Sequence, residues 1–226
     1  MNNSARHAIL SSIRSHLAAS VPFDKHELEV SPGSGSAQVE FKQNGSLADL
    51  FKQSLESVGG HCVIASGEPE IARALTRIIG DLQKTDLRAQ RIAISEAPAV
   101  ERMLYATDLE IEELSVAPNA TDIFNFDVGI TTAQTAIAET GTLVLDSAHE
   151  RHRFASLVPP VHIAIVDASR ICATLAEALT LLRREKEISP RVIFVTGPSR
   201  TADIELTLAI GVHGPQELYV IVNALT

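Results

Sequence analysis

Residue types that define several structural classes are scarce in this chain of 226 residues. Only two cysteines occur, Cys62 and Cys172, and tryptophan is absent. Two thiols are too few for a disulfide framework or for the cysteine ligands of an iron–sulfur cluster, and no CxxC pair indicates zinc. The sequence therefore predicts a protein of a reducing cytoplasm, with no metal and no iron–sulfur cluster bound by this chain.

Positive charge and long apolar runs are scarce as well. The chain has 19 Lys and Arg against 28 Asp and Glu, a net charge of -9, and its basic residues form no stripe. Nucleic-acid phosphates need clustered Lys and Arg, so we do not expect nucleic acid as a partner. No apolar run reaches the roughly 18 residues of a membrane span, and Arg6 and Arg14 interrupt the N-terminal segment. We therefore expect neither a membrane span nor a signal peptide.

Hydrophobic residues make up 45% of the sequence, which is enough for one sizeable core of Val, Ile, Leu and Ala. Apolar residues recur at helical spacing over residues 4–19, which predicts an amphipathic helix. Residues 31–36, Ser-Pro-Gly-Ser-Gly-Ser, have the composition of a flexible linker. We therefore divide the chain into an N-terminal helix and linker, residues 1–45, and an α/β domain, residues 46–226.

Short apolar runs rich in β-branched residues alternate with helical patterns through this domain. The predicted strands are residues 61–65, 91–94, 128–131, 141–145, 162–166, 192–196 and 218–222. The predicted helices are residues 47–58, 69–79, 98–105 and 174–187. This alternation predicts an α/β fold with a mainly parallel sheet flanked by helices. Ligands bind such sheets at the carboxyl ends of the strands, and polar clusters follow several of the apolar runs.

The segment 133–162 concentrates polar groups between two apolar runs and contains Ala-Glu-Thr-Gly-Thr at residues 138–142. Gly141 permits a tight turn and close approach of the backbone to a ligand, and the Thr140 and Thr142 hydroxyls suit a carboxylate or phosphate. Glu139 is a candidate base, nucleophile or hydroxyl acceptor. The alternative is a solvated glutamate at a turn before a strand.

Two arginines follow in the same segment. The guanidinium groups of Arg151 and Arg153 can bind a planar anion through paired hydrogen bonds. The alternative is a charged loop that crosses the surface. No HxH or HExxH spacing occurs among the eight histidines, so a zinc site is not supported.

Two C-terminal segments complete the set of candidate ligand-binding residues. Ser199, Arg200, Thr201 and Asp203 follow a predicted strand, and their groups can hold an anion. Alternatively, Ser199 or Thr201 caps a short helix that the apolar pattern after them predicts.

The second segment reads Gly-Val-His-Gly-Pro and contains His213 and Gly214. Its histidine can bind an anion when protonated, or can pack locally in a turn. Neither segment is a Walker loop or a GxGxxG turn, so nucleotide binding is not supported.

Taken together, four stretches resemble the LUD domain family, and within it the lactate-utilisation protein C type. They are AIAETGTLVL (136–145), SLVPPVHIAIV (156–166), GPSRTADIELTLAIGVHGP (197–215) and LYVIV (218–222). The resemblance implies a fold like that of glucosamine-6-phosphate deaminase, ribose-5-phosphate isomerase and the CoA transferases. It also implies a role in oxidising L-lactate to pyruvate, beside two iron–sulfur partner proteins that carry the clusters.

Two classes of function remain open. In the first, the chain is a non-redox component of a lactate-oxidising assembly that binds partners and a small carboxylate or phosphate. In the second, it is a stand-alone enzyme that uses Glu139 on a CoA thioester, phosphosugar or other small anion. CoA transferases use a glutamate nucleophile on a related fold, but this match to Glu139 is an analogy of fold alone.

The cysteine count makes a direct prediction about metal. Protein purified anaerobically should contain no stoichiometric iron, because two thiols cannot hold a cluster between them. Metal analysis and the visible absorbance spectrum measure this. An iron–sulfur absorbance from this chain alone would overturn the cysteine argument.

Overall fold

The computed structural model describes residues 3–19, 46–95, 98–105, 107–116, 118–119, 121–146, 153–184, 191–202, 208–210 and 214–224. The chain divides into two compact units, Met1–Gln43 and Asn44–Thr226. In the first unit, helix α1 spans Asn3–Ala19, which confirms the predicted helix. The linker predicted within residues 20–45 lies outside the described residues.

The second unit is built on a six-stranded sheet in which every pair of neighbours is parallel. The strand order is β1-β12-β7-β4-β2-β3. These strands are β1 (His61–Ala65), β2 (Arg91–Ile94), β3 (Glu113–Val116), β4 (Val128–Thr132), β7 (Val161–Asp167) and β12 (Glu217–Asn223). The mainly parallel sheet that the apolar runs predict is therefore confirmed.

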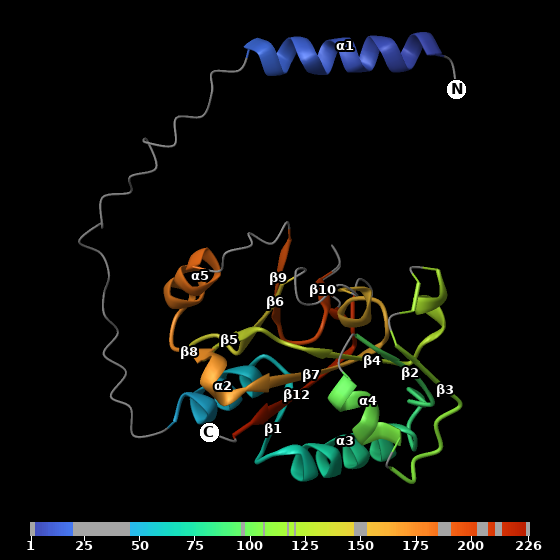
Figure 1. Ribbon diagram of the computed structural model, residues 1–226, viewed down its shortest axis with the longest axis vertical. Helices are drawn as coiled ribbons and strands as arrows, with labels where there is room; N and C mark the ends of the chain where they lie inside the picture. Colours follow the sequence, from blue (N-terminus) through green and yellow to red (C-terminus); the bar gives the residue numbers. More distant parts are fainter. Residues whose placement is uncertain are drawn as a thin grey trace, which may run out of the picture. The chain divides into compact units, whose positions relative to one another are not determined.

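Two helices cover one face of this sheet, α3 (Glu68–Leu82) and α4 (Pro98–Tyr105) (Figure 1). Ile71, Leu75 and Ile79 of α3 are buried against Ile92 and Ile163 in a shared cluster. Spacings of three and four residues place these α3 side chains on one side of the helix. β-branched residues dominate the strands because both faces of the sheet are buried.

The opposite face is covered by helix α2 (Leu47–Ser57) and by a second, four-stranded sheet of order β8-β5-β6-β9 (Figure 1). Its strands are β5 (Thr135–Ile137), β6 (Thr142–Asp146), β8 (Ile171–Cys172) and β9 (Val192–Thr196). Helix α5 (Leu175–Arg184) contributes Ala178 to a small cluster with residues of β5, β6 and β8. The sequence patterns predict two of these strands but not a separate sheet, because β5 and β8 are too short to show periodicity.

The chain after β9 differs from its sequence prediction. A short helix was expected there, but the structure has an antiparallel hairpin of β10 (Arg200–Ala202) and β11 (Leu208–Ile210). The helix prediction is therefore wrong for these residues. The reason is visible in the sequence, where Ile204, Leu206, Leu208 and Ile210 alternate with period two, the period of a strand.

A histidine is buried within the core on the side of the second sheet. His162 of β7 has no exposed surface, and its Nε2 lies 2.8 Å from Oγ1 of Thr131 on β4. Among the described residues, its Nδ1 has no hydrogen-bond partner. Burial lowers the pKa of His162 to about 3, because a dry interior disfavours the charged imidazolium.

This histidine should make the fold sensitive to acid. An unfolded histidine has a pKa of about 6.5, so below that pH the unfolded state binds a proton that the folded state refuses. Stability is therefore fully present above about pH 6.5 and falls by up to about 1.4 kcal/mol per pH unit toward pH 3. The His162→Gln variant should lack this component in urea unfolding measured from pH 7 to pH 4.5. Parallel pH profiles of the two proteins would contradict the assignment.

Candidate functional site

A chain of threonine hydroxyls lies where β6 begins and β9 ends. Thr142 Oγ1 lies 2.7 Å from Thr140 Oγ1 and 2.7 Å from Thr196 Oγ1. Thr142 and Thr196 are paired across β6 and β9. Thr142 is buried, whereas Thr140 and Thr196 are exposed, so the chain links the interior to the surface. Hydroxyls can donate or accept, and this arrangement suits the oxygen atoms of a small anion.

The structure explains why position 141, in the Thr-Gly-Thr turn, is a glycine. Gly141 has a φ of +64°, and a Cβ there would collide with the backbone of Leu55 in α2. The close approach at this glycine is to a helix of the same chain, and its predicted approach to a ligand stays a prediction. α2 itself begins with a capping box, in which Ser46 and Asp49 bond each other's backbone N–H.

Glu139 is exposed at the same turn, but its carboxylate is engaged. Its Oε1 accepts a 2.8 Å hydrogen bond from the backbone N–H of Leu175, the first residue of α5. Its own backbone N–H donates to the carbonyl of Ala173. A carboxylate at a helix N-terminus satisfies a free N–H and interacts favourably with the helix dipole. Glu139 therefore caps α5, a role that sequence reasoning did not assign to it.

The two C-terminal candidate segments lie together. The backbone N–H of Ser199 donates a 2.8 Å hydrogen bond to the carbonyl of Pro215. Gly214 lies beside Ser199, because a Cβ built on Gly214 would be 3.1 Å from the Cβ of Ser199. The exposed Arg200 lays its guanidinium against Gly59, just beyond the end of α2. A cation is favourable there, since the carboxyl end of a helix carries partial negative charge.

These contacts join most of the described candidate residues into one surface, here called the threonine site. It runs from Glu139 and Thr140 through Thr142 and Thr196 to Ser199 and Gly214.

The candidates whose side chains are not described are not placed on this surface. Arg151, Asp203 and His213 lie outside the described residues, and only the backbones of Arg153 and Thr201 are described. Arg153 begins the 3-10 helix η3 (Arg153–Ser156), and Thr201 pairs with Ala209 between β10 and β11. Their ligand-binding roles stay predictions.

A second group of polar residues lies at the carboxyl ends of β2 and β4. Ser95 follows β2, and its backbone N–H donates to Ile130 in β4, which places Ser95 beside Thr131. Both are buried, and Ser95 Oγ has no hydrogen-bond partner among the described residues. After β4, the Gln134 side chain accepts a 2.7 Å bond from the N–H of the buried Asp146.

The sheet topology marks this same place. From β2 the chain continues to β3 on one side, whereas from β4 it continues to β7 on the other. Such a switch point is where ligands bind open α/β sheets. The sequence carries a signal for this place, because Ser95 and Thr131 lie at the ends of apolar runs, but the ligand-binding residues predicted above do not include them. The burial of Asp146 could not be predicted from the sequence, because a single acidic residue at the end of a strand is usually exposed to solvent.

Comparisons with known proteins identify the class to which this fold and surface belong. The profile of the LUD domain matches residues 48–222. A crystal structure of a DUF162 family protein from Deinococcus radiodurans aligns with a TM-score of 0.56 at 21% identity. That alignment covers 79% of this chain and 96% of the other and supports the fold alone.

Curated proteins of similar sequence agree. Lactate utilization protein C of Geobacillus thermodenitrificans is 30% identical over 80% of this chain and 70% of that protein. An uncharacterized protein of Neisseria meningitidis serogroup B is 44% identical over 43% of this chain. Lactate utilization protein C of Bacillus licheniformis is 39% identical over 43% of this chain. In both of these last comparisons the aligned part spans 42% of the relative.

The protein therefore belongs to the LUD domain family, as the four sequence stretches indicate. Its particular likeness is to lactate utilization protein C.

The capping role of Glu139 can be measured. Glu139→Ala removes the acceptor for the Leu175 N–H and should lower the free energy of unfolding by about 1 kcal/mol. Glu139→Gln keeps an amide oxygen that can accept the same bond, so it should cost about half as much. Urea unfolding followed by circular dichroism compares the three proteins. Equal stability of Glu139→Ala and the natural protein would contradict the cap.

Proposed function

We propose that this protein is a cytoplasmic, non-redox component of an L-lactate oxidation system that converts lactate to pyruvate with two iron–sulfur partner proteins. The observation that carries the proposal is the 30% identity to lactate utilization protein C along 80% of this chain. The aligned region includes most of the α/β domain, so the likeness is not confined to one motif.

The chemistry of the cysteines supports placing the redox centres on the partners. Burial raises the pKa of the Cys62 thiol to about 12, and burial together with Glu177 raises the pKa of the Cys172 thiol. A thiol that stays protonated is a poor ligand for iron, since thiolate is the binding form. Within the described residues, no group of three His, Cys, Asp or Glu side chains could hold a metal ion.

The threonine site supports a binding role for a small carboxylate or phosphate. Its hydroxyls and the backbone around Gly214 offer polar groups on one surface.

Among the residues that the structure describes, no helix has the length and apolar character to cross a bilayer.

The alternative is a stand-alone enzyme in which Glu139 acts on a CoA thioester, a phosphosugar or another small anion. The exposure of Glu139 beside the Thr140 hydroxyl favours it. The hydrogen bond from Leu175 counts against it, because this bond ties one carboxylate oxygen to the end of α5. A nucleophile or base must be available to its substrate.

Anaerobic co-purification from lactate-grown cells, followed by lactate oxidation with and without this subunit, tests the proposal. We expect two iron–sulfur proteins to co-purify, the isolated chain to be inactive, and omission of the chain to abolish oxidation. Arg153→Ala and Glu139→Gln should impair growth on lactate at normal protein levels. Arg153→Ala would remove a guanidinium able to bind a carboxylate, and Glu139→Gln would remove a negative charge while keeping an acceptor for α5.

Arg102→Ala is the matched control, because Arg102 lies on α4, on the other side of the parallel sheet, and growth should be normal. Turnover of a CoA thioester or phosphosugar by the isolated chain, lost in Glu139→Gln, would favour the enzyme instead. Normal growth of both site variants would remove the site assignment while leaving the assembly role to the co-purification.

A further inference from the structure

One edge of the parallel sheet, formed by β1, is unpaired among the residues that the structure describes. β1 pairs with β12 on one side, and no described strand pairs with its other side. Ile64 of β1 is 37% exposed, although the strand is otherwise apolar apart from His61. An exposed apolar edge strand presents unpaired N–H and C=O groups and readily accepts another strand. Proteins normally cover or charge such an edge.

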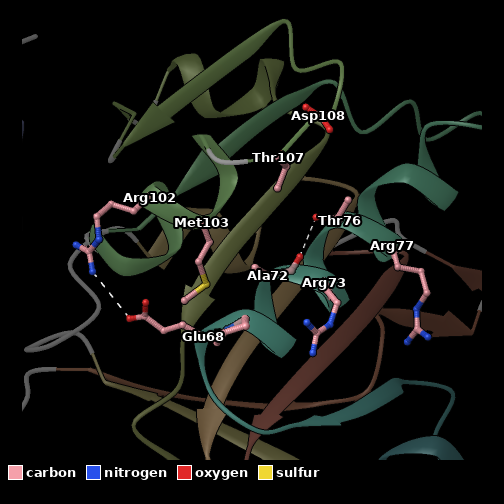
Figure 2. A pocket seen from close by; sticks show the side chains of 10 residues that line it. Glu68, Ala72, Arg73, Thr76, Arg77, Arg102, Met103, Thr107 and Asp108 are labelled. Atoms are coloured by element: carbon pink, nitrogen blue, oxygen red, sulfur yellow. Dashed lines mark hydrogen bonds and ion pairs between the residues drawn. The ribbon is translucent and has the colours of Figure 1, made fainter.

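Helix α3 lies beside this edge. A groove of about 400 Å³ separates them, lined by Val63, Ile64 and Ala65 of β1 and by Glu70, Arg73, Ala74 and Arg77 of α3. The spacing of three, four and seven residues places Glu70, Arg73, Ala74 and Arg77 on one side of α3. Figure 2 shows the Arg73 and Arg77 side chains projecting from α3 in the same direction, away from Asp108.

Between residues 70 and 77, the charges on this side of α3 are separated by sign. Glu70 lies near the N-terminus, Arg73 and Arg77 follow, and Asp81, four residues after Arg77, is already paired with Lys84. Glu70 forms an ion pair of 3.6 Å with Arg73, but their side chains are 48% and 71% exposed, so the pair is weak. Among the described residues, no acidic group forms an ion pair with Arg77. Within residues 70–77 the helix therefore presents one negative and one positive segment to an incoming partner.

We propose that β1 and α3 together form the interface of a symmetric dimer with a second copy of this chain. The two β1 strands would pair antiparallel across a twofold axis, which joins two six-stranded sheets into one. The two α3 helices would lie antiparallel beside each other, with Glu70 of each copy facing the Arg73–Arg77 segment of the other. A twofold interface must be self-complementary, and a surface with both signs separated along its length meets this condition.

The same twofold axis would relate both the two β1 strands and the two α3 helices. Residues 63–65, the second half of β1, line the same groove as Glu70, Arg73, Ala74 and Arg77 of α3, so this half of the strand lies level with the charged segment. α3 contacts both β1 and β12 and therefore lies over the edge of the sheet. Strand pairing at about 4.8 Å would then bring the two helices to about 10 Å, which is the usual spacing of packed helices.

A simple anion fits this surface less well. A second groove, of about 790 Å³ between α3 and α4, includes Arg73, Arg77 and Arg102, but Glu68 and Asp108 line it too (Figure 2). Glu68 already lies 4.0 Å from Arg102. A polyanion would be repelled by these carboxylates and by Glu70, and it would leave the edge of β1 uncovered. A second copy pairs Glu70, Arg73 and Arg77 and covers the edge strand at once.

The first experiment is sedimentation equilibrium of the full-length chain at low salt, with two variants that alter the edge. The natural protein should be a dimer at micromolar concentration. Ile64→Lys, which places a charge on the edge strand, should raise the dissociation constant at least tenfold, and so should Arg73→Glu/Arg77→Glu. Arg102→Glu is the matched control and should leave the dimer intact. A monomeric natural protein, or a dimer unaffected by both edge variants, would overturn the proposal.

The second experiment uses the symmetry. Glu70→Arg alone places arginines opposite arginines, and Arg73→Glu/Arg77→Glu alone places glutamates opposite glutamates, so each variant should be monomeric. Mixed together they should form a heterodimer, because both charged contacts then have opposite signs. Dimerisation of either variant alone, or its absence in the mixture of folded proteins, would contradict the pairing.

Glu70 also accepts a 2.7 Å bond from the Ser66 N–H, so thermal unfolding must first show that Glu70→Arg folds. If it does not, Ile64→Lys and Arg73→Glu/Arg77→Glu still decide the proposal against the Arg102→Glu control.

Discussion

The close contact of α2 with the turn after β5 is the constraint on which the rest of the α/β domain depends. Gly141 brings its backbone directly against Leu55, and no other residue type leaves room for this contact. Because Gly141 ends the turn and directly precedes β6, this contact fixes where the second sheet lies on the parallel sheet. Thr142, Thr196 and the segment leading to Ser199 then take their positions from β6 and β9. The Thr-Gly-Thr turn, which resembles a ligand-binding turn in the sequence, therefore packs α2 against the second sheet.

The boundaries of the longer elements could be predicted because their signals are local. β1, β2, α4 and β9 have the predicted limits, since each is a clear apolar run or helical stripe between breakers. The hairpin of β10 and β11 was mistaken for a helix because a few apolar residues in a short segment fit either period unless they are counted position by position. β5 and β8 went unpredicted because a strand of two or three residues gains its stability from neighbours far away in the chain.

The candidate site shows the same division between local and distant information. The two segments near Ser199 and Gly214 could be identified from residue types, and the structure brings them together. The capping bond from Leu175 to Glu139 could not be foreseen, because it joins positions separated by 36 residues. Ser95 and Thr131 matter through the direction of chain connections, which only the strand order shows. The residue types in the sequence thus identify polar groups. The strand order and chain connections determine which of these groups share a surface.

The pairing of β1 with β12 has a consequence for how the protein is made. His61 and Glu217, at the beginnings of the two strands, are 156 positions apart, so β1 has no neighbour in the sheet until nearly the whole domain has left the ribosome. Contacts of such long range slow folding and leave apolar strands uncovered in the meantime. During synthesis, β1 therefore has both edges open, and the C-terminal strand is the element that completes the sheet.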